Sequence, residues 1–334
     1  MEMLNKKILI TGAAGFVGSQ FVNKLIMSGF PLENLKLVDN LEYGHLHNLN
    51  EGLQKFLTVC DVLDMADDFV PDLIFHFAGI SSLPECESNP TKAYKYNVVS
   101  TARILDLAKN YGSNVVFAST SAIYEKDKRD QYTEDLKVSP RLIYPQTKLA
   151  AEQLCLTYID NYDLKVLICR ISNVFGAHQD FTRANPPFTS YLVKQLLRNK
   201  QIIIYNDDPG TLRDYIYIDD LMLLLTLAVQ KELVGIYNIT SSKCYSTVDI
   251  IQALEKTLNE KIKYIKGESF KFWENYPKLF GGKKPLKDAA IKEEIFKKCH
   301  CSNYKIMNAL GLTHDFISIE KGLLKIIEFQ KNFI

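Results

Sequence analysis

A glycine-rich turn near the start of the chain is the feature that most restricts its fold. The run Lys7–Thr11 (KILIT) predicts a buried strand, and TGAAGFVG follows it with glycines at positions 12, 15 and 18. A helix is predicted directly afterwards, over Phe16–Ser28. Glycine permits a tight turn, leaves room for an anion beside the backbone, and lets the helix pack on the strand. Because the helix N-terminus presents free N–H groups, the unit is predicted to bind the pyrophosphate of a dinucleotide.

The first half of the chain alternates β-branched runs with helical patterns, which is typical of βαβ units and a parallel sheet. The predicted strands are Lys7–Thr11, Leu35–Asp39, Phe56–Cys60, Leu73–Ala78, Val115–Ala118 and Val166–Cys169. The predicted helices are Phe16–Ser28, Pro90–Tyr111 and Gln146–Tyr162. Since crossovers between parallel strands are right-handed, helices should cover both faces. We therefore predict an α/β fold with a Rossmann-type, doubly wound parallel sheet.

After about residue 175 the pattern changes to shorter elements. The predicted strands are Gln201–Tyr205, Asp214–Ile218 and Gly235–Ile239. The predicted helices are Tyr191–Arg198, Asp219–Gln230 and Thr247–Leu258. A length of 334 residues fits about two domains. We predict a dinucleotide-binding domain over 1–175, to which 205–240 partly returns, interleaved with a smaller mixed α/β substrate domain over 176–334.

Composition and charge exclude several classes of protein. Forty Lys and Arg residues against 39 Asp and Glu leave a net charge of +1, which argues against a nucleic-acid-binding protein. The most apolar long run, Leu221–Val229, is far shorter than the ~20 residues that span a membrane, and we expect no membrane association. Seven scattered cysteines predict a reduced, cytoplasmic protein. Cys299 and Cys301 flank His300 without a second ligand pair, so no metal site is predicted.

The segment 256–305 is rich in lysine, with thirteen Lys, six acidic residues and no Arg. One interpretation is an ordinary solvated surface. The other is a basic lid over an anionic ligand that carries a diphosphate.

An acidic residue ends the predicted second strand. Asp39 lies 21 residues after Gly18, where a carboxylate accepts hydrogen bonds from the adenosine ribose and repels a 2′-phosphate. Because Asn40 rather than an arginine follows it, the sequence favours NAD over NADP. The alternative is that Asp39 is only a turn residue. Asp61, at the end of the predicted third strand, is expected to reach the adenine edge.

Three residues form a candidate catalytic group. Tyr144 and Lys148 are four apart at the start of a predicted helix, so they share one face. A phenol has a pKa of about 10, and nearby positive charge lowers it. A decrease of about three pKa units corresponds to ~4 kcal/mol of preferential stabilisation of the phenolate. Thr120 follows a predicted strand at the sheet edge where ligands bind. Each pattern is more often structural when it occurs alone, but the glycine turn, the acidic strand end and these residues in this order favour catalysis.

These motifs resemble the extended short-chain dehydrogenase/reductase family, specifically its NAD-dependent nucleotide-sugar epimerases and dehydratases. The resemblance extends nearly from end to end. The segments that carry it are TGAAGFVG, VDNLEYG, CDVLD, FHFAG, YNVVST, 170–176, 213–220, 237–239, 310–312 and 318–323. It implies NAD as cofactor, a nucleotide-diphosphate sugar as substrate, and a homodimer formed through helices within 90–110 and 146–162.

The resemblance also implies roles for individual residues. Tyr144 would be the base, Lys148 its electrostatic partner and the anchor of the nicotinamide ribose, and Thr120 the partner of a sugar hydroxyl. The implied cofactor-binding residues are Gly12, Gly15, Phe16, Val17, Gly18, Asp39, Asn40, Asp61, Val62, Phe77, Ala78, Gly79, Asn97, Tyr144 and Lys148. The implied substrate-binding residues are Ser81, Thr120, Ser121, Asn173, Phe188 and Arg213, of which Asn173 and Arg213 would hold the diphosphate. Segment 183–190 would lie over the sugar and nucleotide.

One departure from the family pattern bears on the reaction. Dehydratases carry an Asp-Glu pair after the catalytic Thr, and the related decarboxylases carry the Glu, where this chain has Ser121 and Ala122. Alanine cannot act as a general acid, so elimination of water lacks its usual catalyst. The first hypothesis is therefore a 4-epimerase that works through a transient 4-keto sugar with tightly bound NAD. The alternatives are a 4-dehydrogenase or 4-keto reductase, a 4,6-dehydratase-like enzyme, and a non-catalytic NAD-sensing protein on the same fold.

Overall fold

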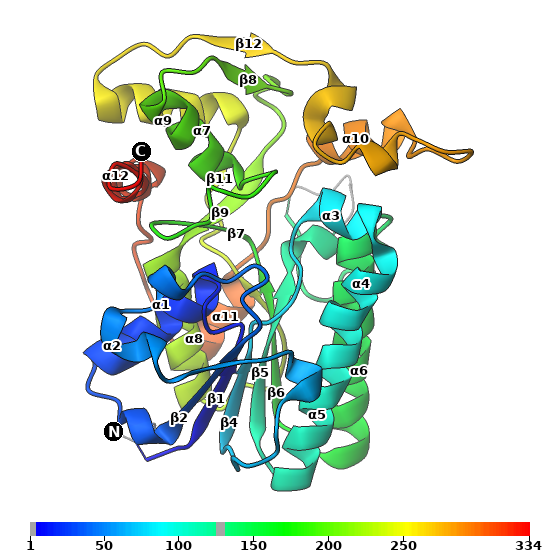
Figure 1. Cartoon of the computed structure of the whole chain (residues 1–334), viewed down its shortest axis with the longest axis vertical. Coiled ribbons are helices and arrows are strands. Elements are labelled where there is room, and N and C mark those ends of the chain that lie inside the picture. Colours follow the sequence, from blue (N-terminus) through cyan, green and yellow to red (C-terminus); the bar gives the residue numbers. More distant parts are fainter. Residues whose placement is uncertain (1–4, 125–130) are drawn as a thin grey trace.

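A computed structural model describes residues 5–124 and 131–334 of the chain and contains two lobes (Figure 1). The lower lobe is built on a parallel sheet of seven strands in the order β10-β6-β5-β4-β1-β2-β3. The strands are β1 (Ile8–Thr11), β2 (Leu35–Asp39), β3 (Leu57–Val59), β4 (Leu73–His76), β5 (Asn114–Thr120), β6 (Val166–Ile171) and β10 (Gly235–Ile239). The order reverses between β1 and β4, which places a ligand-binding crevice at their carboxyl ends. The predicted doubly wound Rossmann-type fold is confirmed.

Helices cover both faces of this sheet (Figure 1). One layer holds α1 (Phe16–Met27), α8 (Ile218–Gln230) and α11 (Tyr304–Leu310); the other holds α5 (Ser100–Tyr111) and α6 (Ile143–Tyr162). Side chains of successive strand residues point to opposite faces of the sheet and so pack against the two helical layers in turn. Ile8 and Ile10 belong to one buried hydrophobic cluster, and Leu9 belongs to the other. In the part of the chain that the structure describes, no helix has both the length and the apolar character to cross a membrane.

The upper lobe is smaller and mixed. Its strands are β7 (Asn173–Phe175), β9 (Arg213–Tyr217) and β11 (Cys244–Tyr245) in one sheet, and β8 (Ile202–Ile204) paired with β12 (Tyr264–Lys266). Its helices are α7 (Phe188–Leu197), α9 (Thr247–Leu258), α10 (Asp288–Ile295) and α12 (Ile319–Gln330). Within 205–240, β9 belongs to this lobe, whereas β10 extends the large sheet. The chain therefore passes between the lobes more than once, and the crevice lies between them.

The predicted helix Pro90–Tyr111 is interrupted in the structure. It consists of α4 (Pro90–Tyr94), a π-helical turn over Lys95–Val99, and α5. The buried Asn97 lies in the π-helical turn, and its side chain hydrogen-bonds Ile80 in the loop after β4. The sequence patterns also did not reveal the short helices α2 (Glu51–Gln54) and α3 (Leu83–Ser88).

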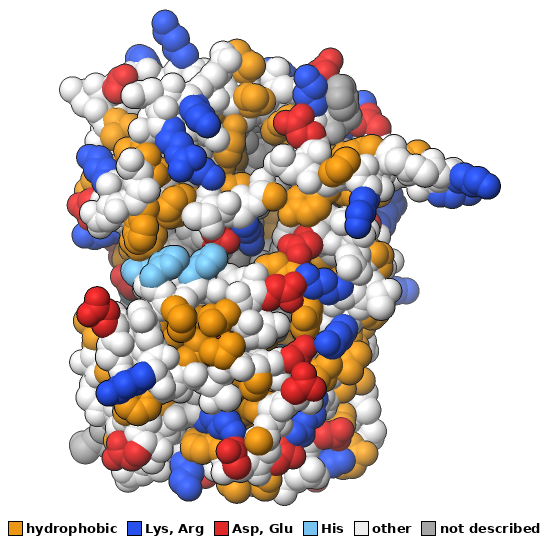
Figure 2. Space-filling model, in the orientation of Figure 1, with side chains coloured by type: hydrophobic (Ala, Val, Ile, Leu, Met, Phe, Trp, Pro, Cys, Tyr) orange, Lys and Arg blue, Asp and Glu red, His pale blue; other side chains and the backbone are white. Residues whose placement is uncertain are grey.

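The lysine-rich segment 256–305 is largely a solvated surface. Its lysines pair with acids there and elsewhere, as in Lys261 with Glu255 at 2.8 Å and Lys292 with Asp288 at 2.7 Å. Figure 2 shows basic and acidic side chains intermixed over the face drawn. These contacts favour the first of the two interpretations and not a basic lid.

A buried histidine joins β1, β4 and α5. His76 Nδ1 lies 2.7 Å from Thr11 Oγ1, and His76 Nε2 lies 3.2 Å from Thr101 Oγ1. Burial, together with the charge of Lys148, lowers the pKa of His76 to about 3. The imidazole is therefore neutral in the folded protein, and it connects the glycine turn to the helix that carries Asn97.

This histidine should make folding sensitive to acid. The unfolded chain binds a proton at His76 near pH 6.5, whereas the folded chain does so only near pH 3. Stability is therefore lost as the pH falls through this window. Between neutral pH and about pH 4.5 we expect wild type to lose about 2–3 kcal/mol more unfolding free energy than His76→Gln. Urea denaturation at both pH values measures the difference, and parallel pH profiles for the two proteins would contradict the assignment.

Candidate active site at the carboxyl edge of the large sheet

The glycine turn forms a cradle that side chains would fill. Gly12 has φ +70°, and a Cβ added there would lie 2.6 Å from the backbone nitrogen of Ala78. A Cβ on Gly18 would lie 2.0 Å from the carbonyl oxygen of Gly12, so this glycine lets α1 pack against the turn. Gly15 is the N-cap of α1, and in the described residues no side chain caps that end. The first N–H groups of α1 are thus available to a phosphate, as the dinucleotide-binding hypothesis requires.

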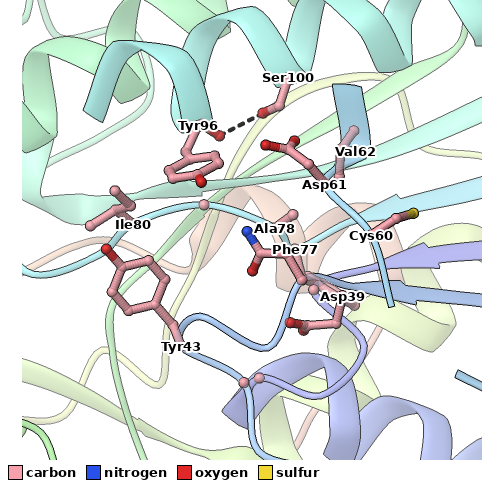
Figure 3. Close-up of a pocket in the computed structure, with 15 residues that line it drawn as sticks. Asp39, Tyr43, Cys60, Asp61, Val62, Phe77, Ala78, Ile80, Tyr96 and Ser100 are labelled. Atoms are coloured by element: carbon pink, nitrogen blue, oxygen red, sulfur yellow. Dashed lines mark hydrogen bonds between the residues drawn. The ribbon is translucent and has the colours of Figure 1, made fainter. Parts of the chain in front are cut away.

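A pocket opens beside this cradle (Figure 3). Nine of the residues proposed for the cofactor line it: Gly12, Gly15, Asp39, Asn40, Asp61, Val62, Phe77, Ala78 and Gly79. Six further residues, which sequence reasoning missed, also line it: Tyr43, Gly44, Cys60, Ile80, Tyr96 and Ser100. Figure 3 shows Asp39 on one side of the pocket and the rings of Tyr43 and Tyr96 on the other. These tyrosines lie in the VDNLEYG and YNVVST segments, so the family motifs could have identified both as residues of the cofactor pocket.

Asp39 ends β2 with its carboxylate held by the backbone. Its Oδ2 accepts from Ala14 N at 3.0 Å and its Oδ1 from Leu41 N at 2.8 Å. Burial raises the pKa of Asp39, and these backbone donors oppose the rise. A carboxylate has about four acceptor sites, so Asp39 can still accept from a ribose hydroxyl. Asp61 lies at the opposite side and pairs with Lys95 at 3.1 Å.

Four of the other proposed cofactor residues lie behind the pocket rather than in its lining. Phe16 and Val17 pack against the hydrophobic core, and Gly18 contacts Gly12. Asn97 Oδ1 accepts from Ile80 N at 2.8 Å, and its Nδ2 donates to Ile80 O at 3.0 Å and Thr147 Oγ1 at 2.9 Å. Asn97 therefore ties the loop after β4 to α6.

The three candidate catalytic residues are all buried where β5 ends and α6 begins. Lys148 Nζ donates to Ala118 O at 2.8 Å and lies 5.0 Å from the centre of the Phe117 ring. Burial lowers the pKa of Lys148 to about 8. Thr120 lowers the pKa of the Tyr144 phenol, which places its hydroxyl near that phenol. The structure thus brings all three together, as the sequence predicts.

The electrostatics of the phenol differ from the expectation. Burial raises the pKa of Tyr144 to about 12, while the Thr120 hydrogen bond and the charge of Arg183 lower it. The sequence predicts that Lys148 lowers this pKa, but its ammonium is directed to the carbonyl of Ala118. Within the described residues, burial outweighs the stabilisation of phenolate. Arg183 lies in the loop before α7, within the segment 183–190 that the resemblance places over the sugar and nucleotide, although it was not singled out as an individual residue.

None of the proposed substrate residues lines the pocket drawn in Figure 3. Ser121 is buried and Ser81 is exposed, while Phe188 begins α7 and is half-buried. Asn173 Nδ2 donates to Asp214 O at 2.8 Å. Arg213 Nη2 donates to Glu294 O, and the same nitrogen lies 3.5 Å from Glu294 Oε1.

Arg213 also has an unmatched donor. Its Nη1 is buried, and no hydrogen-bond partner for it is found among the residues that the structure describes. An unpaired buried donor is costly, so a ligand oxygen at this position would satisfy it. In the described residues, no group of three or more His, Cys, Asp or Glu side chains could hold a metal ion.

A sequence model of the NAD dependent epimerase/dehydratase family matches residues 8–240. The chain belongs to this family. Its cofactor is accordingly NAD, which the cradle at Gly12 and the carboxylate of Asp39 fit.

Relatives in this family have several activities. The chain is 31% identical over 273 residues to UDP-glucuronic acid decarboxylase 1 of Danio rerio, which covers 79% of this chain and 61% of the relative. It is 28% identical over 285 residues to UDP-glucose 4-epimerase of Bacillus subtilis, covering 77% of this chain and 84% of the relative. The match thus spans about three fifths of the decarboxylase.

Solved structures share the fold over nearly the whole chain. A UDP-N-acetylglucosamine 4-epimerase from Methanobrevibacter ruminantium superposes with a TM-score of 0.83 at 21% identity, covering 98% of this chain and 99% of that one. A UDP-glucose 4-epimerase from Thermotoga maritima has a TM-score of 0.81 at 24% identity, with the same coverage. At these identities the likeness supports the fold.

Proposed function

We propose that this protein is a nucleotide-sugar 4-epimerase. The observation that carries the proposal is the buried group of Thr120, Tyr144 and Lys148 at the carboxyl end of β5, beside the dinucleotide cradle. Ser121 and Ala122 follow Thr120 and supply no carboxylic acid. The site therefore holds a base for a sugar hydroxyl but lacks the acid that would expel water.

The chain's own residues would act as follows. Tyr144, as phenolate, takes the proton of the sugar C4 hydroxyl and returns it after the ring has presented its other face. Thr120 lowers the pKa of Tyr144, and its hydroxyl can align the same sugar hydroxyl. Lys148, whose Nζ lies beside Gly79 of the cofactor pocket, is assigned to the ribose of the cofactor. NAD, when bound, supplies the acceptor and donor of the C4 hydride, and its positive ring favours phenolate.

The diphosphate would be held at the other end of the substrate. We assign this role to Arg213 and Asn173, because Arg213 Nη1 is a buried donor that lacks a partner among the described residues. A guanidinium can bind two phosphate oxygens at once. Its contact with Glu294 would then be exchanged for the ligand.

A 4-dehydrogenase or 4-keto reductase is the second candidate activity. A net 4-dehydrogenase or 4-keto reductase would use the same residues, and named relatives include decarboxylases as well as epimerases. A dehydratase is disfavoured by Ala122, and a non-catalytic NAD-sensing role by the intact Thr120, Tyr144 and Lys148.

The reaction can be tested directly. The purified full chain with NAD is incubated separately with UDP-glucose, UDP-N-acetylglucosamine and UDP-glucuronic acid, and products are followed by NMR. We expect the C4 epimer of at least one sugar, with no net formation of NADH. Stoichiometric NADH would indicate a dehydrogenase instead, and loss of water would indicate a dehydratase.

We further propose a cytoplasmic homodimer. All seven cysteines are free thiols in the structure, which agrees with a reducing compartment. Tyr111 on α5 and Tyr162 on α6 are exposed apolar side chains on neighbouring helices, where a second copy would pack. Sedimentation equilibrium of the full chain tests the assembly.

A further inference from the structure

Two segments on either side of the glycine turn are joined to each other at the candidate cofactor pocket. Tyr43, in the loop after β2, donates its hydroxyl to Glu85 on α3. Glu42, the residue before it, pairs with Lys92 on α4. Lys92 Nζ also lies 3.7 Å from Glu85 Oε1, so the two pairs form one cluster. These four residues form what we call the strap.

Lys92 is held in the strap by aromatic rings as well as by acids. Its Nζ lies 5.2 Å from the centre of the Tyr43 ring and 5.9 Å from that of the Tyr96 ring. Both rings line the pocket, and Figure 3 shows them on the side away from Asp39. The side chains of Lys92 and Glu85 are only 28% and 24% exposed. Because solvent screens half-buried charges less than exposed ones, these contacts are stronger than those of a surface ion pair.

The order of the strands places the strap opposite the glycine turn. In the sheet, β2 and β4 lie on either side of β1, and the glycine turn follows β1. The strap joins the loop after β2 to helices that follow β4, so it crosses the carboxyl end of the strand between them. Figure 3 shows the Tyr43 side chain reaching from its own loop towards Ile80, in the loop after β4. Tyr43 lines the same pocket as Gly12, Gly15 and Gly79, so a pyrophosphate at the glycine turn would lie behind the strap.

The loop that carries one half of the strap is anchored at both ends. Leu41 N donates to Asp39 Oδ1 at 2.8 Å, and Leu41 adopts a left-handed backbone with φ +58°. Leucine rarely adopts this conformation, which persists only where surrounding contacts fix it. His45 N donates to Ala14 O, in the glycine turn, at 2.9 Å. A movement of the strap is therefore confined to the few residues between these two anchors.

We propose that the strap is a gate over the cofactor, which must open before NAD enters or leaves the pocket. The strap is closed by contacts among the chain's own side chains, so it slows binding and release alike. Slow exchange keeps a reduced cofactor in place until it returns its hydride. The inference concerns exchange of the cofactor, and it does not depend on which sugar reaction the enzyme carries out.

A gate and a direct contact with the cofactor have different kinetic consequences. A gate that opens more often speeds association and dissociation by the same factor, so the dissociation constant does not change. Loss of a direct contact mainly speeds dissociation and weakens binding. The two rate constants therefore test the inference without a measurement of epimerase activity.

Release of NADH from the loaded full chain measures the dissociation rate constant. The NADH complex is mixed with a large excess of NAD, and the change in NADH fluorescence is followed by stopped flow. Equilibrium dialysis against a series of NADH concentrations gives the dissociation constant, and the ratio gives the association rate constant. We expect Lys92→Met to raise both rate constants by about tenfold and to change the dissociation constant by less than about twofold. Tyr43→Phe, which keeps the ring but removes its hydroxyl, should shift them in the same direction.

Lys305→Met is the matched control. Lys305 also places its ammonium near a tyrosine ring, 4.5 Å from the centre of the Tyr237 ring. It lies on α11 beside β10, which is at the opposite edge of the large sheet from β3. Both rate constants of this variant should equal those of wild type.

The inference fails in any of three cases. Unchanged rate constants in Lys92→Met and Tyr43→Phe would show that the strap does not limit exchange. Faster release at an unchanged association rate constant would show that these side chains bind the cofactor directly. A melting temperature lowered by many degrees together with weaker binding of NADH would show that the cluster only stabilises the fold. None of these results bears on the epimerase assignment, which is tested by the sugar products.

Discussion

Replacing Tyr144 with phenylalanine is expected to lower kcat for C4 epimerisation by about 10³-fold. The substitution removes the hydroxyl that takes the proton while it keeps the ring that packs against Ile80 and Cys86. General base catalysis by a positioned side chain typically contributes 10²–10⁴-fold, and the loss should fall in kcat rather than in binding. NMR of the nucleotide sugar, with the enzyme saturated in NAD, measures the rate.

Tyr304→Phe is the matched control for this experiment. Tyr304 is 74% exposed on α11 and lies outside the crevice, so its hydroxyl should not affect kcat. Circular dichroism and the melting temperature show that each variant is folded. Should Tyr144→Phe retain more than about a tenth of wild-type kcat, the phenol is not the base.

Replacing Glu152 with glutamine is expected to remove about 3–5 kcal/mol of unfolding free energy. Glu152 is fully buried on α6 and accepts three hydrogen bonds from Arg170, at 3.1 Å and 3.2 Å from Nε and 2.8 Å from Nη2. Neutralising one partner leaves the guanidinium buried without its counter-charge, which is the costly case. Since Glu152 lies one turn after Lys148, the pair also fixes the catalytic helix to β6.

Urea denaturation measures this change, and an exposed ion pair provides the control. Glu293 lies 3.0 Å from Arg141, with side chains that are 43% and 70% exposed, so Glu293→Gln should change stability by less than about 1 kcal/mol. The double variant Glu152→Met with Arg170→Met should recover part of the loss, because apolar side chains need no partner. Similar losses for Glu152→Gln and Glu293→Gln would contradict the argument.

Elements with strong local signals were predicted from the sequence with accurate bounds. Leu35–Asp39, Gly235–Ile239 and Thr247–Leu258 have the same limits in the structure. The first two are apolar runs between turn residues, and the third begins with a capping box between Ser246 and Asp249. The spacing of the glycines likewise predicted both the turn and the helix after it.

Contacts between distant residues were not predictable in this way. The π turn in the helix at Asn97 depends on Ile80 and Thr147, which lie 17 and 50 residues away. The sequence places Lys148 one helical turn from Tyr144, yet its ammonium is held by Ala118, which β5 supplies. Arg183 gave no periodic or motif signal of its own, because its effect on the pKa of Tyr144 acts through space.

The sequence by itself determined the doubly wound sheet, the dinucleotide cradle and the family, because periodicity and glycine spacing are properties of neighbouring residues. The tertiary structure alone decided how the charges are disposed around the phenol. It buries Tyr144 and directs Lys148 to a backbone carbonyl. The physical reason is that burial and electrostatic interactions depend on distances through space, and these are set only when parts of the chain that are distant in sequence pack together.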